Sequence, residues 1–236
     1  MRTAKRMVGG VVVLSLGLAA PLAAQTVGGG VKKENLDLPY DAIGETSVDE
    51  DAPEVINFYS QTYEGDGFFF TVDRSGSMQD SGELTRAKNE ISKNIAEFSD
   101  KTEFAIVFFD AGIQKFPQSG RPAEASPGMK SAAMGWIGGI PGGGGSCCMQ
   151  GLREALQYAN LAKAKRKVIV YVGDGGGTCN TNDERGYLQQ MVSQITSQNY
   201  QRAQINAIGV LMGSRWQKDY LKQLCAANGG TYRELN

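Results

Sequence analysis

Residues 68–77 read Phe-Phe-Phe-Thr-Val-Asp-Arg-Ser-Gly-Ser, an apolar run that ends in a polar turn. The run has the length and the aromatic and β-branched content of a buried strand. The turn places one carboxylate, Asp73, and two hydroxyls, Ser75 and Ser77, at the end of that strand. Because open α/β sheets bind ligands at the carboxyl ends of their strands, this stretch predicts both a sheet strand and a candidate site.

Strand and helix patterns alternate on both sides of this stretch. Residues 55–63 are also rich in β-forming residues, and the Asp66-Gly67 step before Phe68 is typical of a hairpin turn between the two runs. Further strands are expected over 104–109, 113–116, 167–172, 205–212 and 231–235, with helices over 83–99, 148–159, 187–195 and around 221–225. Continuously apolar strands interleaved with amphipathic helices predict an α/β doubly wound, Rossmann-like and mostly parallel sheet with helices on both faces.

Two glycine-rich loops add oxygen atoms to the candidate site. The loop over residues 141–146 ends in Ser146 at the start of a helix, and Asp174 follows the strand over 168–172. Two carboxylates and three hydroxyls form an all-oxygen set that suits a hard cation such as Mg²⁺. The set carries too few charges to close the coordination shell, so a position is left open for a carboxylate from another molecule.

Composition excludes several kinds of catalytic and metal site. The chain has 236 residues and no histidine, which rules out Ser-His-Asp and Cys-His catalysis and histidine-bound zinc. Glycine-rich stretches lack a following Lys-Ser or Lys-Thr, so no phosphate-binding P-loop is present. Any metal must therefore be held by oxygen or sulfur.

The N-terminal residues read as a targeting segment rather than part of the fold. Three basic residues precede an uncharged stretch over 7–24, which predicts a secretory signal peptide cleaved after Ala24. An uncleaved membrane anchor is the alternative, since 18 uncharged residues could just span a bilayer. Cleavage would change the net charge from −1 to −4, which disfavours nucleic acid as a partner. The protein is expected to be secreted, periplasmic or in the cell envelope, with no membrane span after cleavage.

Residues 25–54 are polar and acidic and are expected to form a flexible tether or an arm over the domain. The folded domain is expected to occupy residues 55–236.

The ordered motifs resemble the von Willebrand factor A (vWA) domain and its metal-ion-dependent adhesion site (MIDAS). The family pattern is Asp-x-Ser-x-Ser, then Thr after a glycine-rich loop, then Asp within Thr-Asp-Gly. Phe104–Phe109 and the segment from Leu224 to Tyr232 also resemble the family. The resemblance implies that Ser75, Ser77 and Ser146 coordinate Mg²⁺, or Mn²⁺ or Ca²⁺, directly. It implies that Asp73 and Asp174 act largely through water.

The resemblance implies a non-catalytic module that uses the cation to capture an acidic group of a protein partner, in adhesion or complex assembly. A metal-dependent hydrolase using Asp73 or Asp174 is one alternative, although the second carboxylate expected two residues after Asp73 is replaced by Ser75. A metal-free scaffold is another. Oligomeric state is left open.

Three departures from the family pattern qualify these expectations. Ser146 stands where the family has Thr, and Gly173 replaces the Thr before Asp174, which removes a hydroxyl that could orient the ligands. The chain stops after its last expected strand, so the final helix of the family is expected to be absent, and with it an integrin-like helix movement. Residues 25–54 or 55–63 are expected to cover the face left bare.

Four cysteines remain to be assigned. Cys148 and Cys225 fall on apolar helical stripes and are expected to be buried, whereas Cys147 and Cys179 lie in the two metal loops. We predict a Cys147–Cys179 disulfide, with Cys148–Cys179 as the second choice and an adjacent Cys147–Cys148 redox pair as a third. No pair spacing typical of a four-cysteine zinc site is present.

Three residues near the expected loops are candidate partner contacts. Arg74 and Met78 flank the Ser75–Ser77 turn, and Trp136 precedes the glycine-rich loop. Arg74 could instead point to solvent, and Trp136 could pack within the loop before the glycines.

Overall fold

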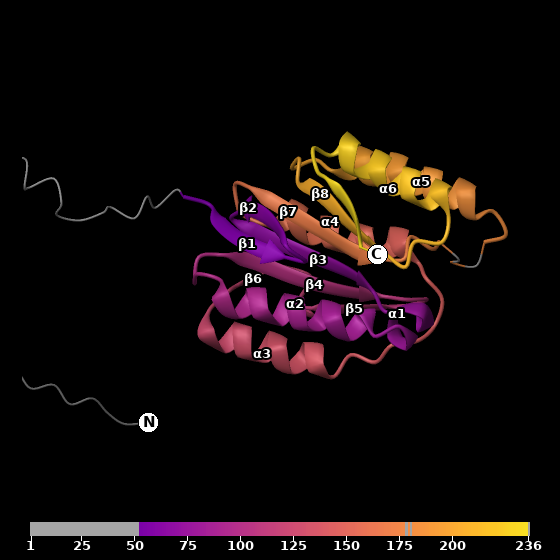
Figure 1. Cartoon of the computed structure of the whole chain (residues 1–236). Coiled ribbons are helices and arrows are strands. Elements are labelled where there is room, and N and C mark those ends of the chain that lie inside the picture. Colours follow the sequence, from indigo (N-terminus) through magenta and orange to yellow (C-terminus); the bar gives the residue numbers. More distant parts are fainter. Residues whose placement is uncertain (1–51, 178, 180, 236) are drawn as a thin grey trace, which may run out of the picture. The chain divides into compact units, whose positions relative to one another are not determined.

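The computed structural model describes residues 52–177, 179 and 181–235 (Figure 1). The signal peptide predicted over residues 1–24 lies outside the described residues. So does the acidic segment predicted over residues 25–54, except for its last three residues. Among the helices that are described, none has the length and apolar character needed to cross a membrane.

A seven-stranded sheet forms the centre of the domain, with the order β5-β4-β3-β7-β8-β9 and β6 paired to β4. The parallel strands are β3 (Gly67–Asp73), β4 (Glu103–Phe109), β7 (Lys167–Gly173), β8 (Gln204–Val210) and β9 (Tyr232–Leu235). The short strands β5 (Ile113–Phe116) and β6 (Ala123–Glu124) run antiparallel to β4. This arrangement confirms the predicted mixed α/β fold with a mostly parallel central sheet.

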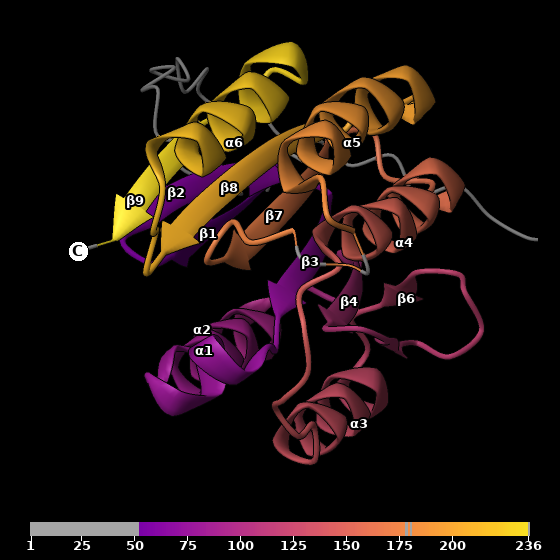
Figure 2. The ribbon, with the colours of Figure 1, turned by 90° about the vertical axis from the view of Figure 1, so that its right-hand side faces the viewer.

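Two apolar cores cover the two faces of the sheet. The helices α4 (Cys148–Leu161), α5 (Glu184–Gln198) and α6 (Arg215–Ala227) pack on one face, as Figure 2 shows. The helices α2 (Glu83–Glu97) and α3 (Pro127–Gly138) contribute to the core on the other face, and the short helix α1 (Gly76–Asp80) adds Met78. Successive strand residues point to opposite faces, so both faces of β3 are buried from Gly67 to Asp73.

Helix α3 was not among the expected helices. It begins with Ser126, whose hydroxyl accepts a hydrogen bond from Met129 N, and with Pro127 in the first turn. A serine cap followed by proline is a recognised start signal, but the glycine- and alanine-rich sequence that follows has little helical periodicity. Trp136 therefore lies on a helix, and its expected position in a loop was wrong.

The first predicted strand is in fact a separate hairpin. Strands β1 (Glu54–Phe58) and β2 (Gln61–Gly65) pair antiparallel around Tyr59 and Ser60, whose φ angles are 51° and 58°. Two positive φ angles in a two-residue loop are typical of a type I′ turn. The hairpin turn predicted at Asp66-Gly67 was wrong.

The glycines at that step serve close packing instead of a turn. A Cβ on Gly65 would lie 2.9 Å from Val168 Cγ2, and one on Gly67 would lie 2.8 Å from the Cβ of Ala164.

The hairpin packs on the sheet face that also carries α2 and α3. Ile56, Phe58, Tyr59 and Tyr63 are buried in the same core as α2 and the strands beneath them. The segment over residues 55–63 is therefore packed into the core of the domain.

Candidate metal centre

Three segments meet at the carboxyl edge of the sheet and bring together all five residues predicted to bind a metal. Ser77, at the start of α1, donates a hydrogen bond to Asp174 Oδ2 over 2.6 Å. Ser146, just before α4, has its Oγ 2.7 Å from Asp73 Oδ2. The hydroxyl oxygens of Ser75 and Ser77 lie 3.0 Å apart. These contacts link Ser75, Ser77 and Asp174 in one group and Asp73 and Ser146 in a second, and the backbone N–H of Ser75 joins the two groups.

Both aspartates use their two carboxylate oxygens in the same way. Asp73 Oδ1 accepts a hydrogen bond from the backbone N–H of Ser75, and Asp174 Oδ1 accepts one from that of Gly176, over 2.7 and 2.9 Å. The second oxygen of each carboxylate bonds to a hydroxyl from a different segment. Each carboxylate therefore shapes its own turn and also connects it to another part of the site.

The network is buried on one side and open on the other. Asp73 and Ser146 are buried, whereas Asp174 is half-buried and Ser77 is exposed. Ser146 Oγ also lies 2.8 Å from the carbonyl oxygen of Gly176, so its single hydrogen can be donated to that carbonyl or to Asp73.

Burial, and after it the negative charge of Asp174, raises the pKa of Asp73 well above its usual value. The two carboxylates therefore lie close enough for the charge of one to affect the ionisation of the other.

The donor set fits a hard cation. In the described part of the chain no ion pair involves Asp73 or Asp174, so their charges are not balanced by a basic side chain there. The described residues also contain no cluster of three or more Asp, Glu or Cys side chains suited to a metal. Two carboxylates with three hydroxyls are therefore the strongest candidate donors, and oxygen atoms are the ligands that Mg²⁺ prefers.

Arg74 supports the site from within and does not point to solvent. Its guanidinium forms an ion pair with Asp110, with Arg74 Nη2 2.9 Å from Asp110 Oδ2, and donates to the carbonyl oxygen of Pro141 over 3.0 Å. The residue is 9% exposed. These contacts disagree with both predictions made for Arg74, which were that it contacts a partner or that it points to solvent.

Asp110 was not among the residues predicted to form the site. It follows β4 directly, just as Asp73 ends β3, and this position at a strand end is the signal that could have identified it. Its backbone carbonyl accepts a hydrogen bond from Cys147 N over 3.0 Å, so it also anchors the residue next to Ser146.

The other two candidate partner contacts lie in the core or against it. Met78 is fully buried, so the prediction that it contacts a partner was wrong. The Trp136 ring packs on Phe108 and Phe116, with ring centroids 5.8 and 5.6 Å apart. Packing is therefore the role that the structure gives Trp136.

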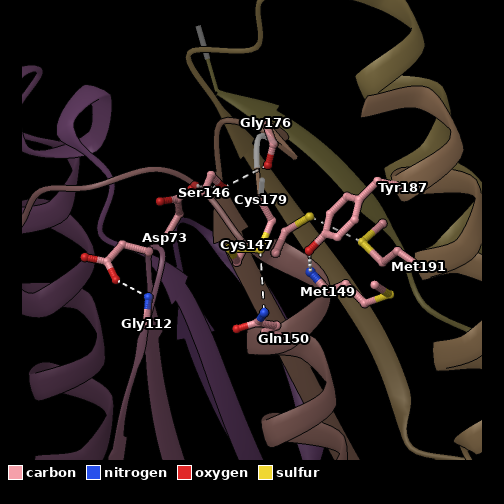
Figure 3. Close-up of a disulfide and its surroundings, with 12 residues drawn as sticks. Asp73, Gly112, Ser146, Cys147, Met149, Gln150, Gly176, Cys179, Tyr187 and Met191 are labelled. Atoms are coloured by element: carbon pink, nitrogen blue, oxygen red, sulfur yellow. Dashed lines mark hydrogen bonds between the residues drawn. A yellow bond between two sulfur atoms is a disulfide. The ribbon is translucent and has the colours of Figure 1, made fainter. Parts of the chain in front are cut away.

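A disulfide joins Cys147 to Cys179 and links the Ser146 segment to the segment that follows Asp174 (Figure 3). The predicted pairing is present, and the two alternative pairings are not, because Cys148 is a free buried thiol. Cys225 is free and buried as well. In Figure 3 the bridge lies between Asp73 and Ser146 on one side and Tyr187 and Met191 on the other. Two glycine-rich segments of the site are thus covalently connected.

Comparisons with known proteins agree with this architecture. The family model described as von Willebrand factor type A domain matches residues 69–234. No curated protein matches the chain.

Three solved structures show the same fold. A von Willebrand factor type A protein from Catenulispora acidiphila has a TM-score of 0.62 and 20% identity, covering 72% of this chain and 38% of that one. Proximal thread matrix protein 1 from the mussel byssus, described with a zinc-occupied MIDAS motif, has a TM-score of 0.53 and 20% identity, covering 71% and 41%. The vWF domain of the type V pili tip protein Mfa5 from Porphyromonas gingivalis has a TM-score of 0.55 and 11% identity, covering 71% and 89%. This chain thus spans less than half the length of the first two proteins.

Proposed function

Since the chain belongs to the von Willebrand factor type A family, we propose that its domain is a non-catalytic binding module that holds a divalent cation at the carboxyl edge of the sheet. The metal ligands are Ser75, Ser77 and Ser146, supported by Asp73 and Asp174. Mg²⁺ is the first choice of cation, with Mn²⁺ and Ca²⁺ as alternatives. The bound cation captures an acidic group of a protein partner.

This proposal rests on one observation. The Ser77 hydroxyl contacts the Asp174 carboxylate, and the Ser146 hydroxyl contacts the Asp73 carboxylate, so that these contacts connect three segments. These contacts gather hard oxygen donors around unbalanced negative charge, which is the environment that a hard cation needs. The cation would supply positive charge and an open coordination position on the exposed side, near Ser77.

The arrangement of Asp73 favours binding over catalysis. Both of its oxygens already accept hydrogen bonds from Ser75 and Ser146, so this carboxylate is placed to orient hydroxyls and not to attack a substrate. Solved structures with a similar fold include a pilus adhesin from Lactobacillus rhamnosus GG and the Mfa5 tip protein. This similarity supports a role in adhesion or complex assembly.

We also propose that the protein is exported to the cell envelope or beyond it. A structural disulfide persists in an oxidising compartment, and residues 1–24 have the pattern of a signal peptide.

The cation site is tested by following the melting temperature during titration with Mg²⁺ or Mn²⁺. Binding to the folded state stabilises it by about 2.7 kcal/mol when the cation concentration is 100 times Kd, so the melting temperature of the wild type should rise. Asp174→Asn should abolish this rise. The matched control is Asp100→Asn, an exposed aspartate that precedes β4, at the opposite edge of the sheet.

A wild-type protein that no divalent cation stabilises would contradict the proposal and favour the metal-free scaffold. For the partner, a pull-down from envelope or extracellular material should recover a protein in Mg²⁺ and lose it in chelator. Recovery that is indifferent to the chelator would contradict capture through the cation.

A further inference from the structure

A tyrosine lies directly beneath the candidate metal centre. Tyr171 is fully buried on β7, beside its register partner Thr71 in β3, and its ring stacks on Phe109 with centroids 5.9 Å apart. A Cβ built on Gly173 would lie 2.5 Å from the Tyr171 hydroxyl and 3.0 Å from the Cβ of Asp73. The phenol oxygen therefore fills the space that a side chain at residue 173 would occupy, immediately before Asp174.

This contact explains why residue 173 is glycine. Side chains two residues apart on a strand share a face, so Tyr171 and residue 173 compete for the same volume. Any side chain at 173 would meet the phenol oxygen well inside van der Waals contact.

The hydroxyl has no partner that accounts for its burial. Among the described residues it makes no hydrogen bond of normal geometry. Burial, followed by the negative charges of Asp73 and Asp174, raises the pKa of Tyr171, while the backbone N–H of Gly175 lowers it in part. The phenol is therefore neutral, keeps a hydrogen to donate, and lies near both the aspartates and the turn that follows Asp174. Leaving such a group unpaired costs about 1–3 kcal/mol.

We propose that Tyr171 is a positioning residue of the cation site, whose hydroxyl supports the Gly173–Gly175 turn from beneath and supplies the hydroxyl that residue 173 lacks. The inference rests on the proposed function, because it assigns a residue to that same site. A neutral phenol behind two carboxylates can donate a hydrogen bond toward them through one buried water and so reduce their mutual repulsion. Residues of this kind orient ligands without touching the metal.

The chain offers a closely matched control. Tyr232 on β9 also has a buried hydroxyl without a partner among the described residues, and that hydroxyl lies 2.6 Å from the position of a Cβ on Gly209. After burial, the carboxylate that raises the pKa of Tyr232 is Glu234 and not an aspartate of the site. Tyr171→Phe and Tyr232→Phe therefore both remove a buried hydroxyl that lies against a glycine, and only the first change faces the candidate metal centre.

The test measures Mn²⁺ affinity of the full chain by calorimetry, and amide hydrogen exchange of residues 173–177 without metal. Tyr171→Phe should weaken Mn²⁺ binding by about 10-fold, the smaller of the effects known for groups that orient metal ligands. It should also accelerate amide exchange in the turn. Its melting temperature without metal should not fall below that of the wild type, because removing a buried hydroxyl that has no protein partner also removes its desolvation cost. Tyr232→Phe should change neither readout.

The inference is overturned if Tyr171→Phe binds Mn²⁺ within twofold of the wild type, or if its turn exchanges no faster than that of Tyr232→Phe. Failure of the proposed function gives a different result. In that case the wild type itself would bind no Mn²⁺, and the exchange measurement alone would decide whether Tyr171 supports the turn.

Discussion

Arg74 shows how one residue between two site residues can order several loops. Its backbone N–H donates to Phe109 O, and its carbonyl oxygen accepts from Gly143 N, both over 2.8 Å. Its side chain reaches Asp110 and Pro141. The end of β3, the end of β4 and the glycine-rich loop therefore all depend on this residue. A long cationic side chain between Asp73 and Ser75 serves the scaffold of the site rather than its open face.

Arg74→Ala is expected to lower the free energy of unfolding by about 3 kcal/mol, because it leaves the largely buried Asp110 carboxylate without its ion-pair partner. Lys163→Ala is the control. Its ion pair with Glu124 is exposed, with a nitrogen-to-oxygen distance of 3.8 Å, and its loss should cost less than about 0.5 kcal/mol. Urea unfolding measures both values, and equal values for the two variants would contradict a structural role for Arg74.

At the scale of elements, the disulfide fixes the start of α4 against the segment after β7. Cys147 directly precedes α4 and donates its backbone N–H to Asp110 O. Ser146 is therefore held by a covalent bond on its neighbouring residue and by the end of β4. Glycine-rich loops lose much conformational freedom on folding, and a covalent link reduces the freedom that they have to lose.

Removing the disulfide should lower both stability and cation affinity. The linked cysteines are 32 residues apart, and closing a loop of this size stabilises a fold by about 3.7 kcal/mol. The double variant Cys147→Ser/Cys179→Ser should lose this amount and bind Mn²⁺ more weakly. Reductant should lower the melting temperature of the wild type but not that of the double variant. An equal response of both proteins to reductant would argue against the link.

The opposite edge of the sheet carries an ion pair with a predictable pH dependence. Asp66, just before β3, accepts hydrogen bonds from Arg166 N and Arg166 Nη2, over 2.9 and 2.6 Å. Burial alone would raise the pKa of Asp66, but the hydrogen bonds and charge of Arg166 outweigh it and lower that pKa below its usual value.

Because the pKa of Asp66 is lower in the folded state, its contribution to stability is complete above the unfolded pKa of about 3.9 and is lost as the pH falls through the folded value. Wild type should therefore exceed Asp66→Asn in unfolding free energy at pH 6, and the two should converge toward pH 2. Urea unfolding across this range gives the comparison. A difference that stays constant with pH would show that the charge of Asp66 is not responsible.

At the scale of the whole molecule, the β1-β2 hairpin belongs to the domain although it pairs with no strand of the large sheet. The Phe58 ring lies 5.2 Å from that of Phe70 in β3, measured between centroids. Arg233 in β9 donates to the carbonyl oxygen of Tyr59 over 2.6 Å. The hairpin thus contacts both β3 and β9.

Phe58→Ala should destabilise the domain by about 3–5 kcal/mol, because it empties a fully buried ring position in the core beneath the hairpin. Val55→Ala in the same hairpin is the control. Val55 is 56% exposed, so its truncation should cost less than about 0.5 kcal/mol. Thermal unfolding should place the two variants far apart, whereas similar melting temperatures would mean that the hairpin is only loosely attached.

The sequence by itself determined the α/β class, the strands and helices with strong periodicity, and the five oxygen-bearing residues at strand and loop ends. These features are local: burial on two faces makes a strand continuously apolar, and a polar residue directly after such a strand must lie at the edge of the sheet. The Cys147–Cys179 pairing followed from the same reasoning, because both cysteines lie on loops that reach that edge.

The tertiary structure alone decided the features that depend on distant contacts. The turn at Tyr59-Ser60 has no glycine, and it forms where Phe58 and Tyr59 can both be buried. Pairing of Arg74 with Asp110 requires β3 and β4 to end side by side. Packing across the sheet also decides that the Tyr171 hydroxyl fills the space beside Gly173. Spacing along a chain specifies which face of a sheet a side chain occupies, but it does not specify which neighbour fills the space beside that side chain.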